Sequence, residues 1–187
     1  NIFRLVIDVK IDNKNSVINK EKKTRKESKF IITIDAGHGG IDPGAINLGK
    51  KEKNITLAAA KELKNMLEKK NFKVFLTREN DTFISLRNRR NIAKKNNSDL
   101  FISLHIDSLN KKTTRGTSIY TLSEKASDSI TAKLAERENK VDLIAGVNLQ
   151  DVDNEVASIL LDLSRRETKN SSSLFAESYV NIVRKNG

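Results

Sequence analysis

The chain has 187 residues and a formal net charge of +11 at pH 7, with 37% hydrophobic and 32% charged residues. This length and composition predict a globular domain with a buried core, and no apolar run approaches the roughly 20 residues of a membrane span. Because the sequence has no cysteine, a disulfide framework, a cysteine-ligated zinc site and a thiol nucleophile are excluded.

The excess of positive charge suggests nucleic-acid binding, but the basic residues lack the pattern of such a protein. They are mostly lysines spread along the chain, and only two tyrosines and no tryptophan could stack on bases. The one dense basic cluster lies within 11–29, a polar stretch that we interpret as a flexible linker. A basic surface would also attract an anionic polymer such as a bacterial wall, or it could reflect lysine usage alone. We expect no nucleic-acid partner.

Strand and helix patterns alternate from residue 30 onward, which predicts an α/β fold. Residues 1–10 precede this region and resemble a strand cut from something longer. The expected elements, in chain order, are a strand at 30–35, a Gly-rich loop to 49, a helix at 54–70, a strand at 72–77, a helix at 85–95 and strands at 99–107 and 116–122. Ser85 is a candidate N-cap of the second helix. Two further helices are expected at 124–139 and 151–185, the latter with a break near 169–173.

The chain has two histidines, and each follows a predicted buried strand. His38 lies in the Gly-rich run 35–40, and His105 lies at the end of the third strand. Ligands of open α/β sheets bind at the carboxyl ends of strands, and imidazole is the commonest metal ligand. Together with Glu52 on the loop between them, they predict a catalytic zinc site with one open position. Asp107 is expected on the same side of its strand as His105.

These assignments have alternatives. The two histidines could make hydrogen bonds at a sheet edge, without a metal. Glu52 precedes a predicted helix, where the macrodipole favours an acidic residue in any case. A phosphate-binding role of the Gly-rich loop is excluded, because the loop lacks both the ending of a P-loop and the spacing of the dinucleotide fingerprint.

Five motifs together resemble the zinc-dependent N-acetylmuramoyl-L-alanine amidases of bacterial cell walls, the Amidase_3 family. They are IDAGHGGIDPGA at 34–45, KEKN at 51–54, LTR at 76–78, SLRNR at 85–89 and DLFISLHID at 99–107. The resemblance implies a three-layer αβα domain with a mostly parallel or mixed sheet. It also implies a Zn²⁺ cofactor held by His38, Glu52 and His105, with Asp107 as a weaker candidate. The substrate would be peptidoglycan, cleaved between N-acetylmuramic acid and L-alanine.

The stretch after residue 122 resembles the helical insertion of the cell-division subgroup of these amidases. In that subgroup a helix blocks the active site, and one of its glutamates ligates the zinc until a degenerate LytM-type activator removes it. The resemblance implies a regulatory insertion at 123–170, autoinhibition by Glu138, a periplasmic location and a role in daughter-cell separation. Glu138 could instead be a solvated charge. Residues 1–10 would end a β-rich targeting domain, 11–29 would be a linker and 30–187 a catalytic domain, expected to be monomeric.

One departure from the family concerns the general acid and base. In these amidases a second glutamate on a strand near the C-terminus has that role, and no residue up to Gly187 fills it. Loss of a general acid or base commonly costs a factor of about 10² to 10⁴ in rate. We therefore expect a fragment or a truncated product. The alternative function is a weak or inactive remnant that binds zinc, cell wall or an activator.

Overall fold

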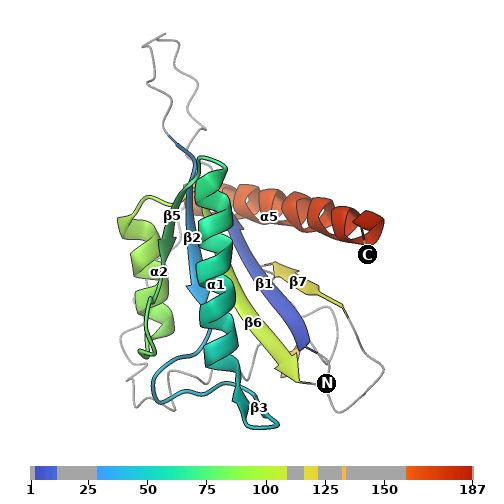
Figure 1. Ribbon diagram of the computed structural model, residues 1–187. Coiled ribbons are helices and arrows are strands. Elements are labelled where there is room, and N and C mark those ends of the chain that lie inside the picture. The colour runs from blue at the N-terminus through green and yellow to red at the C-terminus, as the bar shows by residue number, and fades with distance from the viewer. Residues whose placement is uncertain (1–2, 12–28, 109–115, 122–131, 134–158, 187) are drawn as a thin grey trace.

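The computed structural model describes residues 3–11, 29–108, 116–121, 132–133 and 159–186, and its centre is a five-stranded sheet (Figure 1). The strand order is β5-β2-β6-β1-β7. The strands of this sheet are β1 (Phe3–Ile11), β2 (Ile31–Ala36), β5 (Lys73–Leu76), β6 (Leu100–Ser108) and β7 (Ser118–Thr121). A separate hairpin is formed by β3 (Ile46–Asn47) and β4 (Lys50–Lys51). The helices are α1 (Glu52–Lys69), α2 (Leu86–Lys95) and α5 (Ile159–Asn186).

The sheet is mixed. β2 runs parallel to both β5 and β6, whereas β1 is antiparallel to β6 and parallel to β7. Each strand and helix expected between residues 30 and 122 is present close to its expected bounds. Ser85 caps α2 as expected, because its side chain accepts a hydrogen bond from the backbone N–H of Asn88. The predicted α/β fold is therefore confirmed.

Successive side chains of β2 point to opposite faces of the sheet, and a helix covers each face. Ile32, Ile34 and Ala36 are buried on the face that α1 covers, and the parallel register places apolar residues of β6 beside them. Thr33 and Asp35 point to the opposite face, where Asp35 binds Arg89 of α2. The arrangement of α1, sheet and α2 thus gives three layers, as expected.

The first segment of the chain lies in this sheet. Residues 1–10 were expected to end a preceding domain, but β1 is hydrogen-bonded between β6 and β7. An unpaired side of β6 would leave a row of backbone N–H and C=O groups without partners, and β1 satisfies them. In the structure this strand therefore contributes to the same sheet that carries His105.

Helix α5 is continuous through residues 169–173, so the expected break there is wrong. The segment contains neither proline nor glycine, and its serines only weakly disfavour a helix. Thr168 and Ser172 are buried, while Phe175 and Tyr179 pack against the core. These four residues share one face of α5 at helical spacing, so tertiary packing stabilises the helix across the serine-rich stretch.

Several expectations fall outside the described residues. These are the linker at 11–29 apart from its ends, nearly all of the helix at 124–139, and Glu138. Over the part of the chain that the structure describes, no helix combines the length and hydropathy of a membrane span.

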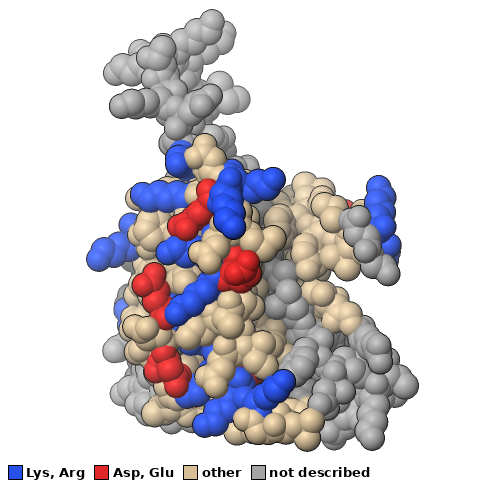
Figure 2. All heavy atoms as spheres, viewed as in Figure 1, with Lys and Arg blue, Asp and Glu red and all other residues tan. Residues whose placement is uncertain are grey.

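The basic charge is mixed with acidic charge on the face that α1 covers. Figure 2 shows Lys and Arg side chains interspersed with Asp and Glu over this face. For example, the Nζ of Lys64 lies 3.6 Å from the Oε1 of Glu79 and 4.0 Å from the Oε1 of Glu68. A continuous positive stripe, such as a nucleic-acid backbone would require, is not what this face presents.

Candidate metal centre

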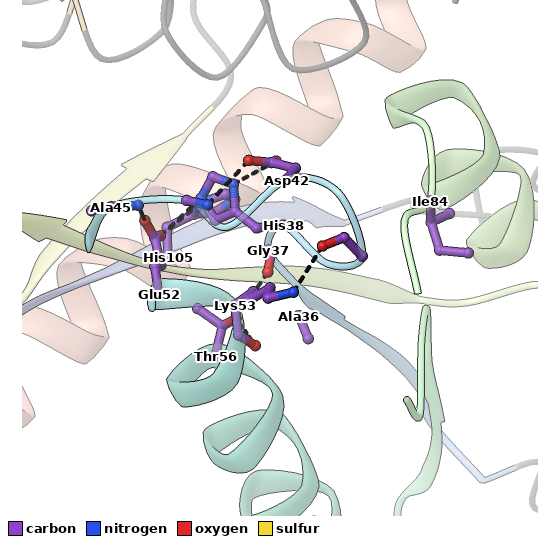
Figure 3. A network of polar contacts seen from close by, with 12 residues as sticks. Ala36, Gly37, His38, Asp42, Ala45, Glu52, Lys53, Thr56, Ile84 and His105 are labelled. Atoms are coloured by element: carbon purple, nitrogen blue, oxygen red, sulfur yellow. Dashed lines mark hydrogen bonds and ion pairs between the residues drawn. The ribbon is translucent and has the colours of Figure 1, made fainter. Parts of the chain in front are cut away.

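Three elements meet near the carboxyl ends of β2 and β6 and bring His38, Glu52 and His105 together (Figure 3). His38 follows the end of β2, His105 lies on the neighbouring strand β6, and Glu52 is the first residue of α1. A hydrogen bond of 3.0 Å from the backbone N–H of Gly37 to the carbonyl oxygen of Leu104 holds the two strand ends together. The three residues expected at the metal site are therefore neighbours in the fold.

Their potential donor atoms form a nearly equilateral triangle. His38 Nε2 lies 3.0 Å from Glu52 Oε1 and 3.1 Å from His105 Nδ1, and His105 Nδ1 lies 3.2 Å from Glu52 Oε1. Tetrahedral zinc with bonds of about 2.0–2.1 Å separates its ligand atoms by about 3.3–3.4 Å. The donor set and its spacing thus fit a zinc ion with three protein ligands.

Asp42 orients the imidazole of His38. Its Oδ2 lies 2.7 Å from His38 Nδ1, and its Oδ1 accepts a hydrogen bond from the backbone N–H of Gly44 at 3.1 Å. Burial acts to raise the pKa of Asp42, but the hydrogen bond to His38 contributes to a net lowering below its usual value. A carboxylate at Nδ1 favours the tautomer with its proton there, which leaves the Nε2 lone pair toward the other two residues. Asp42 was not among the predicted site residues, although its place four residues after His38 was a usable signal.

Glu52 is held in place by backbone N–H groups. Oε1 accepts from Ile106 at 2.7 Å and Oε2 accepts from Ala45 at 2.8 Å. Burial acts to raise the pKa of Glu52, but the imidazoles of His105 and His38 outweigh it and hold the pKa well below its usual range. An acidic residue that only complements a helix dipole would not need these contacts. Glu52 is a buried anion directed at two imidazoles.

Two glycines allow the backbone to approach these side chains. A Cβ atom on Gly37 would lie 2.5 Å from Cε1 of His105, and one on Gly44 would lie 2.5 Å from Cδ2 of His38. Either position would force the imidazole to move. The glycines of the loop therefore form part of the wall of the site.

Arg78 and Arg89 lie behind the cluster and are both buried. They donate hydrogen bonds to backbone carbonyl groups of the loop that carries His38. Arg78 belongs to the LTR motif at 76–78 and Arg89 to the SLRNR motif at 85–89. Neither motif indicated these contacts. Of the remaining candidates, Asp107 lies on β6 opposite Arg4 of β1 in the strand register, and its side chain lies outside the described part. The whole of Glu138 lies outside it as well.

Comparison with known proteins gives consistent matches. A family model described as N-acetylmuramoyl-L-alanine amidase matches residues 32–187. The amidase AmiA of Escherichia coli (strain K12) is 41% identical over 159 residues, which cover 83% of this chain and 55% of that protein. AmiC of Neisseria meningitidis (serogroup B) is 39% identical over 150 residues, covering 79% of this chain and 36% of the relative. This chain therefore spans about half, or less, of the length of these relatives.

A similarity to a solved structure is also found. The N-acetylmuramoyl-L-alanine amidase from Clostridium difficile 630 is 36% identical, with a TM-score of 0.44 over 47% of this chain and 50% of that chain.

Proposed function

This chain belongs to the N-acetylmuramoyl-L-alanine amidase family, and we propose that it is a zinc-dependent peptidoglycan amidase. The bond cleaved would be the amide between the lactyl group of N-acetylmuramic acid and the L-alanine of the stem peptide. The observation that carries the proposal is the triangle of His38 Nε2, Glu52 Oε1 and His105 Nδ1, with sides of 3.0–3.2 Å. Water would supply a hydroxyl to the carbonyl carbon and a proton to the leaving amine, so the products are a carboxylic acid and a free alanine N-terminus.

The residues of the centre have separate parts in this proposal. When bound, a zinc ion lowers the pKa of a bound water to about 7 and polarises a carbonyl group. His38, Glu52 and His105 would hold the ion and leave one position open, as in catalytic zinc sites. Asp42 keeps the His38 ring in the correct tautomer and orientation. The backbone N–H groups of Ala45 and Ile106 keep the Glu52 carboxylate directed at the imidazoles.

The described residues also favour a second candidate function. The metal-binding group found among them contains one carboxylate, Glu52, and Asp42 is engaged by His38. A general acid and base would need another group near the scissile bond, and its loss costs a factor of about 10² to 10⁴. The second candidate is therefore a zinc-binding domain of low turnover, which binds cell wall or an activator.

The regulatory assignments rest on the sequence resemblance. We propose that 123–170 is a regulatory insertion, that Glu138 is its autoinhibitory residue and that a LytM-type activator in the periplasm displaces it during daughter-cell separation. A cluster of three protein ligands supports this proposal, since it leaves a tetrahedral ion with a fourth position for a carboxylate. Displacement of that carboxylate would switch the enzyme on.

Product analysis of digested peptidoglycan tests the proposed reaction. The chain would be incubated with purified peptidoglycan and zinc, with and without activator, and the released peptides would be examined for new L-alanine N-termini. The amidase proposal predicts such peptides, and it predicts none from His105→Ala. Binding to peptidoglycan without any new alanine N-terminus would contradict the amidase proposal and support the low-turnover domain.

A further inference from the structure

We infer that Arg78 and Arg89 are positioning residues of the metal centre, which hold the three ligand-bearing segments in the arrangement that zinc requires. The inference rests on the proposed function, because it concerns the same site. It is carried by a set of buried hydrogen bonds that link the His38 loop, the start of α1 and strand β6.

Arg89 fixes the backbone at His38. Its Nη2 donates to the carbonyl oxygen of His38 at 3.0 Å, and its Nη1 donates to Ala36 at 2.9 Å. The φ angle of His38 is 61°, a left-handed conformation that non-glycine residues rarely adopt. Such a conformation persists where the surroundings enforce it. The Nε of Arg89 donates to the carbonyl oxygen of Ile84 at 2.7 Å, which fixes the guanidinium in place. The guanidinium in turn holds the backbone of His38 in this conformation.

Arg78 links the His38 loop to the helix that carries Glu52. Its Nε donates to the carbonyl oxygen of Ala36 at 2.9 Å. Its Nη2 donates to the carbonyl oxygens of Gly37 at 2.9 Å and of Lys53 at 2.8 Å. Lys53 directly follows Glu52 at the start of α1. One side chain therefore sets the distance between the segments that carry two of the three ligands.

Asp35 extends the set of contacts to the third ligand. Its Oδ1 lies 2.8 Å from Arg89 Nη1, and its Oδ2 accepts a hydrogen bond from Ser103 Oγ at 2.6 Å. Ser103 lies two residues before His105 on β6, so the two side chains share one face of the strand. The chain of contacts from Arg89 through Asp35 and Ser103 thus connects the backbone of His38 with the strand of His105.

These contacts are directed at the ligand-bearing segments. The carbonyl groups of Ala36, Gly37 and His38 are consecutive, and each accepts a hydrogen bond from Arg78 or Arg89. A guanidinium presents its donors in a rigid planar fork, whereas a lysine ammonium is a single point charge. Replacement by lysine would keep the charge and lose the simultaneous contacts, so the geometry of the zinc ligands would be less well defined.

The test compares the zinc affinity of the full chain carrying Arg89→Lys with that of the unmodified chain, by competition with a chromophoric chelator at pH 7. The control is Arg90→Lys, because Arg90 is the exposed neighbour on the same helix. We expect Arg89→Lys to weaken zinc binding by about 10- to 100-fold and the control to leave it unchanged. Urea unfolding without metal is measured in parallel. A purely structural role would lower the free energy of unfolding, but it would not change the affinity of a chain that remains folded.

Each outcome decides the inference. Zinc affinity of Arg89→Lys equal to that of the unmodified chain would overturn it. If Arg89→Lys does not fold, Ser103→Ala is the deciding variant, since it removes one hydroxyl and keeps the apolar core. Weaker zinc binding by Ser103→Ala would support the inference, and unchanged binding would overturn it. Failure of the unmodified chain to bind zinc would overturn the proposed metal centre together with the inference, which distinguishes the two failures.

Discussion

Asp42 Oδ2 lies 2.7 Å from His38 Nδ1, on the side of the imidazole opposite to Glu52 and His105. The two ring nitrogens of His38 thus have different partners. One is engaged by a carboxylate that fixes the ring, and the other faces the cluster that we propose to hold zinc. This relationship makes the metal site dependent on a residue that does not itself belong to the cluster.

Asp42→Asn should therefore weaken zinc binding although Asp42 is not a proposed ligand. The amide keeps the shape of the carboxylate, but it loses the charge that supports the Nδ1–H tautomer and the basicity of Nε2. We expect the dissociation constant for zinc to rise by about 10- to 100-fold, measured by chelator competition. Glu62→Gln, an exposed residue of α1, is the matched control. Equal affinity of Asp42→Asn and of this control would show that Asp42 does not orient His38.

Gly37→Ala should disrupt the site through the size of one methyl group. The new Cβ would lie 2.5 Å from Cε1 of His105, so the ring must leave the position in which Nδ1 lies beside the other two donor atoms. We expect loss of zinc binding and a destabilisation of about 1–3 kcal/mol, as for an overpacked core site, measured by titration and by urea unfolding. Gly49→Ala is the control, since its Cβ would meet no atom within 4 Å. Its φ of 74° adds only backbone strain, which should leave zinc affinity intact.

Asp35 should make the stability of the fold depend on acidic pH. Although burial alone would raise its pKa, Arg89 and the hydroxyls of Ser103 and Thr77 hold the pKa below the usual value of 3.8. A group whose pKa is lowered by folding stabilises the protein above its unfolded pKa, and that contribution is lost as pH falls through the folded pKa. The free energy of unfolding should therefore exceed that of Asp35→Asn by a constant amount above about pH 5.

Below pH 3.8 the difference between the two free energies of unfolding should shrink. It should shrink as pH falls toward the lowered pKa of Asp35 in the folded chain, where the carboxylate becomes protonated. Urea unfolding at a series of pH values, without metal, measures both proteins under the same conditions. A difference that stays constant down to the acid limit would mean that the charge of Asp35 does not stabilise the fold.

Glu138→Ala should raise basal activity if Glu138 occupies the open zinc position. Removal of the carboxylate would free that position for water, so peptidoglycan release without activator should increase. We expect an increase of at least about 10-fold, which corresponds to a carboxylate–zinc interaction worth about 1.4 kcal/mol. Glu136→Ala is the matched control, because it removes the same charge two residues away. The same release from both variants would argue against autoinhibition by Glu138.

The sequence predicted the elements around the site better than the contacts that support it. His38, Glu52 and His105 were identified because strand ends and metal-ligating residue types can be recognised locally. The contacts of Arg78 and Arg89 could not be predicted, since their partners lie 41 and 51 residues away. Whether a buried arginine meets a backbone carbonyl depends on how the elements pack.

The two differences in the fold have a related cause. The sequence of β1 predicts a strand, but strand order depends on long-range pairing, here with residues 100–108. The serine-rich part of α5 has weak helix propensity, and burial of Thr168 and Ser172 with packing of Phe175 outweighs it. Local patterns do not report such tertiary contacts.

The most direct measurement is the zinc content of the purified chain after exhaustive dialysis, compared with that of His105→Ala. Circular dichroism would establish that both proteins are folded. We expect about one zinc ion per chain for the unmodified protein, since three protein ligands form a single site, and a loss of that zinc in His105→Ala. No stoichiometric zinc in the unmodified chain, or the same zinc content in both proteins, would contradict the proposed metal centre.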